Sequence, residues 1–409
     1  MRPFTSIISI DEARSRLDAA VVPIARVERV GLAAAAGRVA AETIVSTIDV
    51  PPFARSAMDG FAVRAADTRD ASDDRPVHLR VVDEIYTGQV PRVRVEAGTC
   101  ARIATGAPMP EGADAVVMVE ETSNLSDEGV DILAEATAGQ NVGRQGADIR
   151  IGEPVAKPGD WLSASRLGAV AAVGCATLAV FERPRVAILS TGNEVIEPGQ
   201  PLRAGQIFDV NRFTLSAVVE AHGGIAVPLA PVGDTPDALL RALDACEEGG
   251  ADIVIFSGGS SVGDHDLTAD VVAARGRMVF HGIAVKPGKP TAFAALDRRG
   301  GGTTPFFGMP GNPTSCLSNA YIVLVPFLRA TARLPLWAPR ILRVPLARRI
   351  TSVADRHQFY TVRLEQGTAV PAFKGSGEIT SLSQADGYIE IASAVTAVDA
   401  GTLVDVTLF

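Results

Sequence analysis

The chain has 409 residues, of which 47% are hydrophobic and 21% charged, so it can hold more than one folded domain and is too apolar to be disordered as a whole. Its formal net charge of −9 argues against a general nucleic-acid-binding surface. No apolar run reaches the ~18 residues of a membrane span, and the first 17 residues lack the apolar core of a signal peptide, so we expect a cytoplasmic protein without membrane contact.

The four cysteines are scattered along the chain, and no two of them form a CxxC pair. This spacing indicates neither a zinc site nor a disulfide framework. Cys316 stands at an expected helix start, where a thiolate would be stabilised, but no histidine lies near it in sequence. We therefore expect reduced, mostly buried thiols, and for Cys316 a small apolar role.

The N-terminal half predicts a connecting domain and an inserted module. Residues 8–20 follow a helical pattern, and residues 31–42, GLAAAAGRVAAE, are small and compatible with a helix. From Asp49 to about residue 138, short alternating runs predict a strand-rich module of β hairpins. Residues 161–180 return to a helix and a strand. We therefore assign residues 1–48 and 149–182 to a connecting domain and residues 49–148 to an inserted strand-rich domain.

Residues 183–332 predict a three-layer α/β domain with a mostly parallel sheet. Short β-branched runs alternate there with helical stretches, as in repeated βαβ units. One run ends in a polar turn with Glu194, and another ends in Gly258, Gly259 and Ser260. Loops beyond the carboxyl ends of parallel strands converge on one crevice, which makes these loops candidate binding elements. The alternative is that the glycines serve only tight turns.

A third loop, in FGMPGNPTSCLSN at residues 307–319, has the layout of an anion cradle. Two prolines remove backbone donors, two glycines allow close approach to a ligand, and a predicted helix starts in the same loop. The backbone N–H groups of Asn312, Thr314 and Ser315 could then point outward. The candidate residues of this loop are Pro310, Gly311, Asn312, Pro313 and Ser315.

Charged residues near these loops suggest a phosphate site with a metal ion. Lys286 and Lys289 stand among stiff prolines and a glycine in VKPGKP, which favours an oxyanion clamp over the alternative of a solvated pair. Carboxylates that flank a phosphate site typically hold Mg²⁺. Asp234, however, also stands where a helix N-cap is expected, and Asp264 and Asp266 precede another expected helix.

Residues 334–340, LPLWAPR, read as a proline-bearing linker, and the remaining residues alternate apolar and polar over short runs. This period of two predicts a small antiparallel β domain over residues 333–409, which we expect to be barrel-like. The expected fold class is therefore a multidomain α/β plus β protein.

Eight ordered sequence blocks resemble the molybdopterin molybdenumtransferases, the MoeA and gephyrin E-domain family of molybdenum cofactor biosynthesis. They span nearly the whole chain, which makes a chance match implausible. The blocks are PPFARSAMDGFAVRAAD (51–67), RIATGAPMPEGADAVVMVEE (102–121), GADI (146–149), LSTGNEV (189–195), IFDVNRFTL (207–215), SGGSSVGDHD (257–266), VKPGKPTAF (285–293) and MPGNPTS (309–315).

This resemblance implies a Mg²⁺-dependent reaction of adenylylated molybdopterin with molybdate, in which AMP leaves and the pterin dithiolene receives the metal. It favours Asp59, Glu194, Asp234 and Asp266 as catalytic carboxylates, the last three as metal ligands. Thr105 and Asp148 join the glycine loops, the two lysines and the 310–315 loop as substrate-binding candidates. Which loop holds the oxyanion and which the pterin stays open.

Two positions depart from the family pattern. Arg55 stands where the pattern before SAMDG usually has Asn, and Asn193 stands where many relatives have Asp. If position 55 contacts the ligand, a longer cation replaces a short amide there, which puts phosphate affinity or the insertion chemistry in question.

The resemblance further implies an elongated homodimer whose site is built across the subunit interface, with Asp59, Thr105 and Asp148 on one side of it. Further expected partners are the adenylyltransferase of the same pathway and the molybdoenzymes that are served. Two alternative functions stay open. One is a tungstate-inserting paralogue, and the other is a pterin-binding scaffold that has lost turnover.

Overall fold

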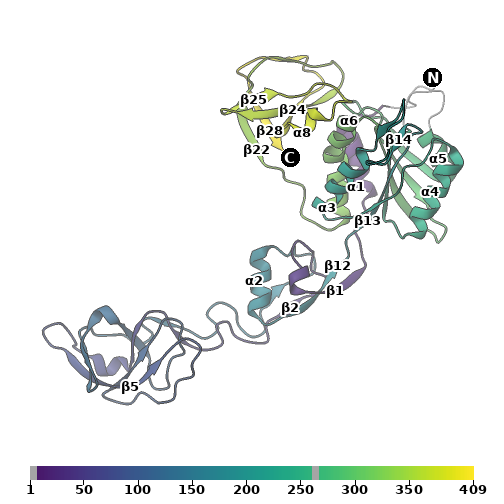
Figure 1. Cartoon of the computed structure of the whole chain (residues 1–409). Coiled ribbons are helices and arrows are strands. Elements are labelled where there is room, and N and C mark those ends of the chain that lie inside the picture. The colour runs from purple at the N-terminus through teal and green to yellow at the C-terminus, as the bar shows by residue number, and fades with distance from the viewer. Residues whose placement is uncertain (1–6, 260–266) are drawn as a thin grey trace. The chain divides into compact units, whose positions relative to one another are not determined.

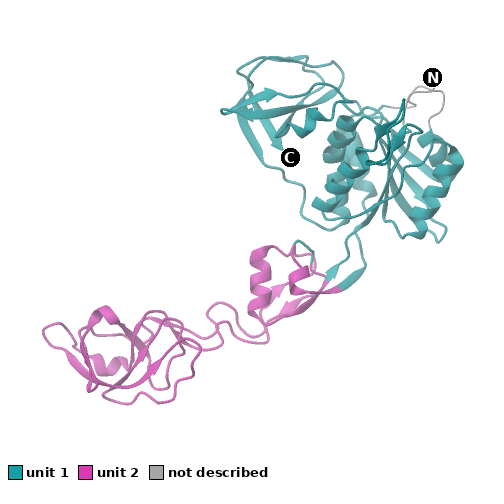
Figure 2. Ribbon diagram, in the orientation of Figure 1, with its two compact units in different colours: residues 1–28, 37–39, 180–409 teal, residues 29–36, 40–179 magenta. Residues whose placement is uncertain are grey.

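The computed structural model describes residues 7–259 and 267–409. They form two compact units, unit 1 with the described residues of 1–28, 37–39 and 180–409, and unit 2 with residues 29–36 and 40–179 (Figure 2). The chain passes between the units within β1 (Val27–Gly31) and β12 (Thr177–Phe181), and on both sides of residues 37–39. Two predicted site residues, Ser260 and Asp266, lie outside the described residues, as does Asp264. None of the helices within the described ranges is both long and apolar enough to span a bilayer.

Unit 1 is built on a six-stranded sheet in the order β16-β13-β17-β21-β20-β18. The first four strands pair in parallel, and β20 and β18 add an antiparallel edge. The mostly parallel sheet is thus confirmed. The strands are β13 Arg185–Ser190, β16 Ile225–Pro228, β17 Ile253–Ser257, β18 Gly276–His281, β20 Ala292–Asp297 and β21 Thr303–Met309.

Helices cover both faces of this sheet because successive strand residues point to opposite sides. Ile253 and Ile255 of β17 belong to one core cluster, while Val254 and Phe256 of the same strand belong to the other. The first cluster packs α1 (Ile10–Ala20), α3 (Asn211–Ala221), α6 (Pro313–Asn319), a π-helical segment (Ala320–Leu324) and α7 (Val325–Thr331). The second packs α4 (Pro236–Glu248) and α5 (Leu267–Arg275), which Figure 1 shows on the other side of this sheet from α1 and α3. The three predicted layers are confirmed.

The C-terminal part of unit 1 is a small, mainly antiparallel β structure, as predicted. Its largest sheet runs β19-β24-β26-β28-β22, with β25 also paired to β24. β19 comes from the α/β part and pairs in parallel with β24. The elements are β19 Val285–Lys286, β22 Ile341–Pro345, β23 Ile350–Thr351, β24 His357–Glu365, β25 Thr368–Pro371, α8 Thr380–Ser383, β26 Gly387–Ile391, β27 Ala397–Val398 and β28 Leu403–Leu408.

Unit 2 contains a six-stranded sheet in the order β7-β4-β6-β5-β9-β8. β5 and β6 pair in parallel, so the strand-rich module is not made of hairpins alone. Its strands are β4 Gly60–Val63, β5 Val77–Ile85, β6 Thr99–Ile103, β7 Ala115–Met118, β8 Thr122–Ser126 and β9 Gly129–Ile132, with 3₁₀ turns at Ala65–Thr68 and Val119–Glu121.

The rest of unit 2 holds α2 (Ala164–Ala172) and two short strand pairs. These are β2 (Ile44–Val45) with β11 (Pro154–Ala156), and β3 (Arg55–Ser56) with β10 (Val142–Gly143). A helix over residues 31–42 does not form, because the small side chains offer little apolar surface to bury and Gly37 adopts a φ of 73°. Only Leu32–Ala34 make one 3₁₀ turn.

The linker after α7 is held to the α/β part through an aromatic contact. The ring of Trp337 meets the ring of His222 edge-on, with centroids 4.5 Å apart, and Tyr321 meets the same histidine at 6.1 Å. His222 follows the last residue of α3 and is 7% exposed. Burial, and to a lesser degree the charge of Arg329, lower the pKa of His222 to about 4.

This buried histidine predicts an acid-sensitive fold. The unfolded chain protonates His222 near pH 6.5 and the folded chain only near pH 4, so unit 1 should lose stability as the pH falls between these values. The slope from this one group approaches about 1.4 kcal/mol per pH unit. Urea unfolding, followed by Trp337 fluorescence in a Trp161→Phe background, measures it. His222→Phe keeps an edge-on ring and should flatten the pH dependence, whereas equal slopes for variant and parent would contradict the assignment.

Candidate active site

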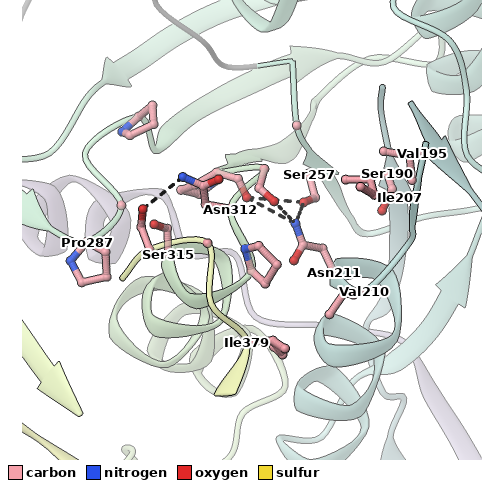
Figure 3. A pocket seen from close by; sticks show the side chains of 18 of the residues that line it. Ser190, Val195, Ile207, Val210, Asn211, Ser257, Pro287, Asn312, Ser315 and Ile379 are labelled. Carbon is pink, nitrogen blue, oxygen red and sulfur yellow. Dashed lines mark hydrogen bonds between the residues drawn. The ribbon is translucent and has the colours of Figure 1, made fainter. Parts of the chain in front are cut away.

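The loops at the carboxyl ends of the parallel strands line one cavity of about 1300 Å³ in unit 1. It lies beyond β13, β17 and β21, as the crossover rule for parallel sheets predicts. Figure 3 shows Ser190, Val195 and Ile207 on one side of Asn211, with Pro287 and Ser315 on the other. The predicted residues that line the cavity are Glu194, Asp234, Gly258, Gly259, Lys286, Lys289, Pro310, Gly311, Asn312, Pro313 and Ser315.

Glu194 and Asp234 form a carboxylate pair in this cavity. The pKa of the half-buried Asp234 carboxyl is raised, first by burial and then by the negative charge of Glu194. Thr235, not Asp234, caps α4, because its side chain accepts from the backbone N–H of Ala238. The capping alternative for Asp234 is therefore wrong. Its Oδ1 atom is buried without a hydrogen-bond partner in the described part of the chain.

A buried polar segment in the lining of the cavity joins the ends of three strands. Asp209 Oδ1 accepts from the hydroxyl of Ser190 at 2.7 Å, at the end of β13. Asn211 Nδ2 donates to Ser257 Oγ at the end of β17 and to the carbonyl oxygen of Gly311, each at 2.7 Å. Sequence analysis missed both residues as site residues, although IFDVNRFTL is one of the eight blocks.

Cys316 belongs to the same buried region. Its Sγ lies 3.8 Å from Ser257 Oγ, and burial raises its pKa to about 12. Cys316 is fully buried in the first core cluster, and a thiol with such a pKa carries almost no thiolate at neutral pH, which supports the predicted apolar role.

The lysines of the chain are concentrated at this cavity. The sequence contains four lysines, and Lys286, Lys289 and Lys374 line it. Lys286 ends β19, which pairs with β24 of the C-terminal part. Arg356 adds a fourth cationic side chain to the lining. Because a low-dielectric cavity strengthens charge interactions, this cationic side suits an anionic ligand.

The 310–315 loop differs from the predicted anion cradle in one respect. The backbone N–H of Thr314 donates to the carbonyl oxygen of Ser376 at 3.1 Å and is not directed at a ligand. The side-chain amide of Asn312 donates to Ser376 Oγ at 3.2 Å, and Thr314 Oγ1 donates to the carbonyl oxygen of Glu378 at 2.8 Å. The start of α6 is thus partly covered by the C-terminal part.

Residues 373–379 of the C-terminal part are the main group that sequence analysis missed. Phe373, Lys374, Gly375, Ser376, Gly377 and Ile379 all line the cavity. The glycine-flanked serine and the lysine before it were the available signal, in a region read only as β structure. Lys374 Nζ donates to Thr380 Oγ1 at 2.9 Å.

The other predicted residues that the structure describes belong to unit 2. Asp59 and Thr105 lie together there, because Asp59 Oδ1 accepts from the backbone N–H of Thr105 at 2.8 Å. Asp148 is exposed, and its backbone N–H donates to the carbonyl oxygen of Val50 at 3.0 Å. Arg55 is an exposed residue of β3, paired with Gly143 of β10.

No group of three or more His, Cys, Asp or Glu residues within 7–259 and 267–409 is placed to hold a metal ion. Two of the three predicted ligands, Glu194 and Asp234, are neighbours in the cavity. The third, Asp266, lies outside the described residues.

Comparisons with known proteins cover nearly the whole chain. The family model of the MoeA N-terminal region, domains I and II, matches residues 8–174, that of the probable molybdopterin binding domain matches residues 187–330, and that of the MoeA C-terminal region, domain IV, matches residues 343–409. Molybdopterin molybdenumtransferase 2 of Mycobacterium tuberculosis is 36% identical over 97% of this chain and 98% of its own length. Molybdopterin molybdenumtransferase of Haemophilus influenzae is also 36% identical, over 79% of this chain and 77% of its own.

Solved structures agree with this match. Two crystal structures of molybdopterin biosynthesis MoeA proteins from Pyrococcus horikoshii have TM-scores of 0.82 and 0.83 at 37% and 29% identity, and they cover 98% and 99% of this chain and 99% and 100% of their own. The family predicted from the eight sequence blocks is confirmed, and this chain belongs to the MoeA family.

Proposed function

We propose that this chain is a transferase of molybdenum cofactor biosynthesis that inserts molybdenum from molybdate into adenylylated molybdopterin. In the proposed reaction one water cleaves the pyrophosphate link and AMP leaves, while the two dithiolene sulfurs replace two oxygens of molybdate, which leave as water. The observation that carries the proposal is one cavity lined by three of the four lysines and by the Glu194–Asp234 pair. The names of the curated relatives support it.

The cationic side of the cavity would bind the anionic parts of the substrates. Lys286 and Lys289 lie on either side of Gly288, and Arg356 and Lys374 line the same cavity. Molybdate is a tetrahedral dianion, and the pyrophosphate link carries further negative charge. Cationic groups that are already in place would attract both anions. At the phosphate being cleaved they would also stabilise the charge that develops, without any reorganisation of the site.

The carboxylate side fits a divalent cation. Burial, and then the negative charge of Glu194, raise the pKa of Asp234, and a buried Asp234 oxygen lacks a hydrogen-bond partner among the described residues. A Mg²⁺ ion takes oxygen ligands and keeps several waters, so this pair would hold it together with water and substrate oxygens, and with Asp266 as the proposed third carboxylate. When bound, Mg²⁺ supplies charge neutralisation at the phosphate oxygens.

We propose further that the enzyme is a cytoplasmic homodimer with sites completed by unit 2 of the partner subunit. Asp59, Thr105 and Asp148 belong to the inserted module, while the cavity residues belong to unit 1. A two-fold dimer would then contain two identical composite sites. Asp59 is exposed, and within the described residues its carboxylate accepts a hydrogen bond only at Oδ1, from Thr105, which leaves its other oxygen for a ligand.

The proposed function predicts Mg²⁺-dependent release of AMP when the protein is incubated with adenylylated molybdopterin and molybdate. Glu194→Gln and Asp234→Asn keep side-chain shape but remove negative charge, and each should slow AMP release by at least about tenfold. Calorimetric titration with Mg²⁺ should show weaker binding to the same two variants. Pterin binding without AMP release would identify a scaffold, and faster turnover with tungstate than with molybdate would identify the tungstate paralogue.

The lysine clamp predicts loss of substrate affinity in single variants. Lys286→Ala and Lys289→Ala should each weaken binding of adenylylated molybdopterin by about 1.5–3 kcal/mol, because a charged hydrogen bond is lost. Calorimetry at low salt measures the affinity. Lys157→Ala, which removes the fourth lysine of the chain, is the matched control and should bind as the parent does. Parental affinity in both test variants would make the two lysines a solvated pair.

Composite sites predict recovery of activity from two inactive variants. Asp59→Ala and Glu194→Ala should each be inactive alone, since each lacks one side of every site. After subunit exchange, a heterodimer carries one site with both lesions and one with neither, so roughly half of its activity should return. Mass spectrometry verifies that heterodimers form. If they form and stay inactive, each site is built within one chain.

A further inference from the structure

The two lysines of VKPGKP sit on a closed turn. The carbonyl oxygen of Lys289 accepts from the backbone N–H groups of both Ile283 and Thr291, at 3.0 and 2.9 Å. Gly288, between the lysines, adopts a φ of 101°, a region that favours glycine. The spacing of the two ammonium groups therefore depends on the conformation of this one turn.

A single buried side chain supports the turn from behind. Asn319, the last residue of α6, is 1% exposed, and its Nδ2 donates to the carbonyl oxygen of Gly288 at 2.7 Å and to Thr291 Oγ1. The hydroxyl of Thr291 donates to the same Gly288 carbonyl oxygen at 2.9 Å. A Cβ atom at Gly288 would collide with the Asn319 side chain, so the approach is close.

The helix that ends at Asn319 begins within the 310–315 loop. α6 begins at Pro313, and Pro313 and Ser315 line the cavity. Directly after Asn319 the helix changes from α to π over Ala320–Leu324, a form that is frequent at functional sites. One helix thus connects both anion-binding candidates, the loop at its start and the lysine turn at its end.

The side-chain amide of Asn319 carries a free-energy cost of burial, so packing alone does not explain why an amide stands at this position. Asn319 Oδ1 is buried without a hydrogen-bond partner among the described residues. An unpaired buried acceptor is unfavourable, and a leucine of similar size would fill the position without that penalty. What the amide adds over a leucine is the pair of hydrogen bonds to Gly288 and Thr291.

We infer that Asn319 is a positioning residue for anion binding, which acts by fixing the turn that carries Lys286 and Lys289. This inference rests on the lysine clamp of the proposed function. It assigns to Asn319 no contact with substrate. Asn319 holds the turn through its hydrogen bond to the Gly288 carbonyl oxygen, and the hydroxyl of Thr291 donates to the same oxygen.

The test is a calorimetric titration of the full chain with inorganic pyrophosphate at low salt. Asn319→Leu should weaken pyrophosphate binding about tenfold in the parent background and have no further effect when Lys286 and Lys289 are both alanine, because coupled residues are not additive. Thr291→Val removes the hydroxyl without changing shape and should act in the same direction. Thr291→Val therefore tests the inference on its own if Asn319→Leu does not fold.

The control is Ile322→Ala, a buried substitution in the same helical run that does not line the cavity. It should lower the melting temperature and leave pyrophosphate affinity unchanged. Equal losses from Asn319→Leu in both backgrounds would indicate general loosening and overturn the inference. If the lysine variants weaken binding but Asn319→Leu and Thr291→Val do not, the inference fails and the lysine clamp stands. If the lysine variants bind pyrophosphate as the parent does, the inference about Asn319 and the proposed lysine clamp both fail.

Discussion

The cavity depends on one buried polar connection, the segment of Asp209 and Asn211 at the start of α3. A parallel sheet brings the ends of its strands to one edge, but it does not by itself hold the loops beyond them in register. Asp209 fixes the end of β13 through Ser190, and Asn211 joins the end of β17 to the Gly311 carbonyl beyond β21. The hydrogen bonds to Ser190 and Ser257 are buried, and the one to Gly311 is partly buried. Breaking either of the buried ones leaves a buried polar atom unpaired.

Side chains of opposite charge line the same cavity. Glu194 and Asp234 extend from the loops next to β13, and the two lysines of the 285–290 turn line the same cavity. The protein as a whole is acidic, with a net charge of −9. An anionic ligand therefore needs a local cationic site, and the distribution of lysines along the chain provides one. The supports of that site, Asn211 and Asn319, are neutral amides, which hold backbone carbonyls without changing the local charge.

Much of the fold and of the site was predictable, because both follow from local pattern. Fully buried apolar runs such as Ile253–Ser257 indicated parallel strands, and polar turns after them indicated the cavity. Other features depend on contacts between distant residues. The hydrogen bond from Thr314 to Ser376 and the lining by residues 373–379 join segments about 60 residues apart, and no local period reports such a contact. Thr235 caps α4 although aspartate is the better N-cap residue in isolation, while the backbone N–H of Asp234 donates to Asn193 Oδ1, 41 residues away in the chain. The four-domain division stays a prediction.

The central claim is that the cavity beyond β13, β17 and β21 is where the anionic substrates meet. The most direct measurement is diffraction from crystals grown with molybdate, with data collected at the molybdenum absorption edge. The account predicts an anomalous peak inside the cavity, beside Lys286 and Lys289. A peak found only outside the cavity, or none at a molybdate concentration that saturates binding in solution, would contradict it.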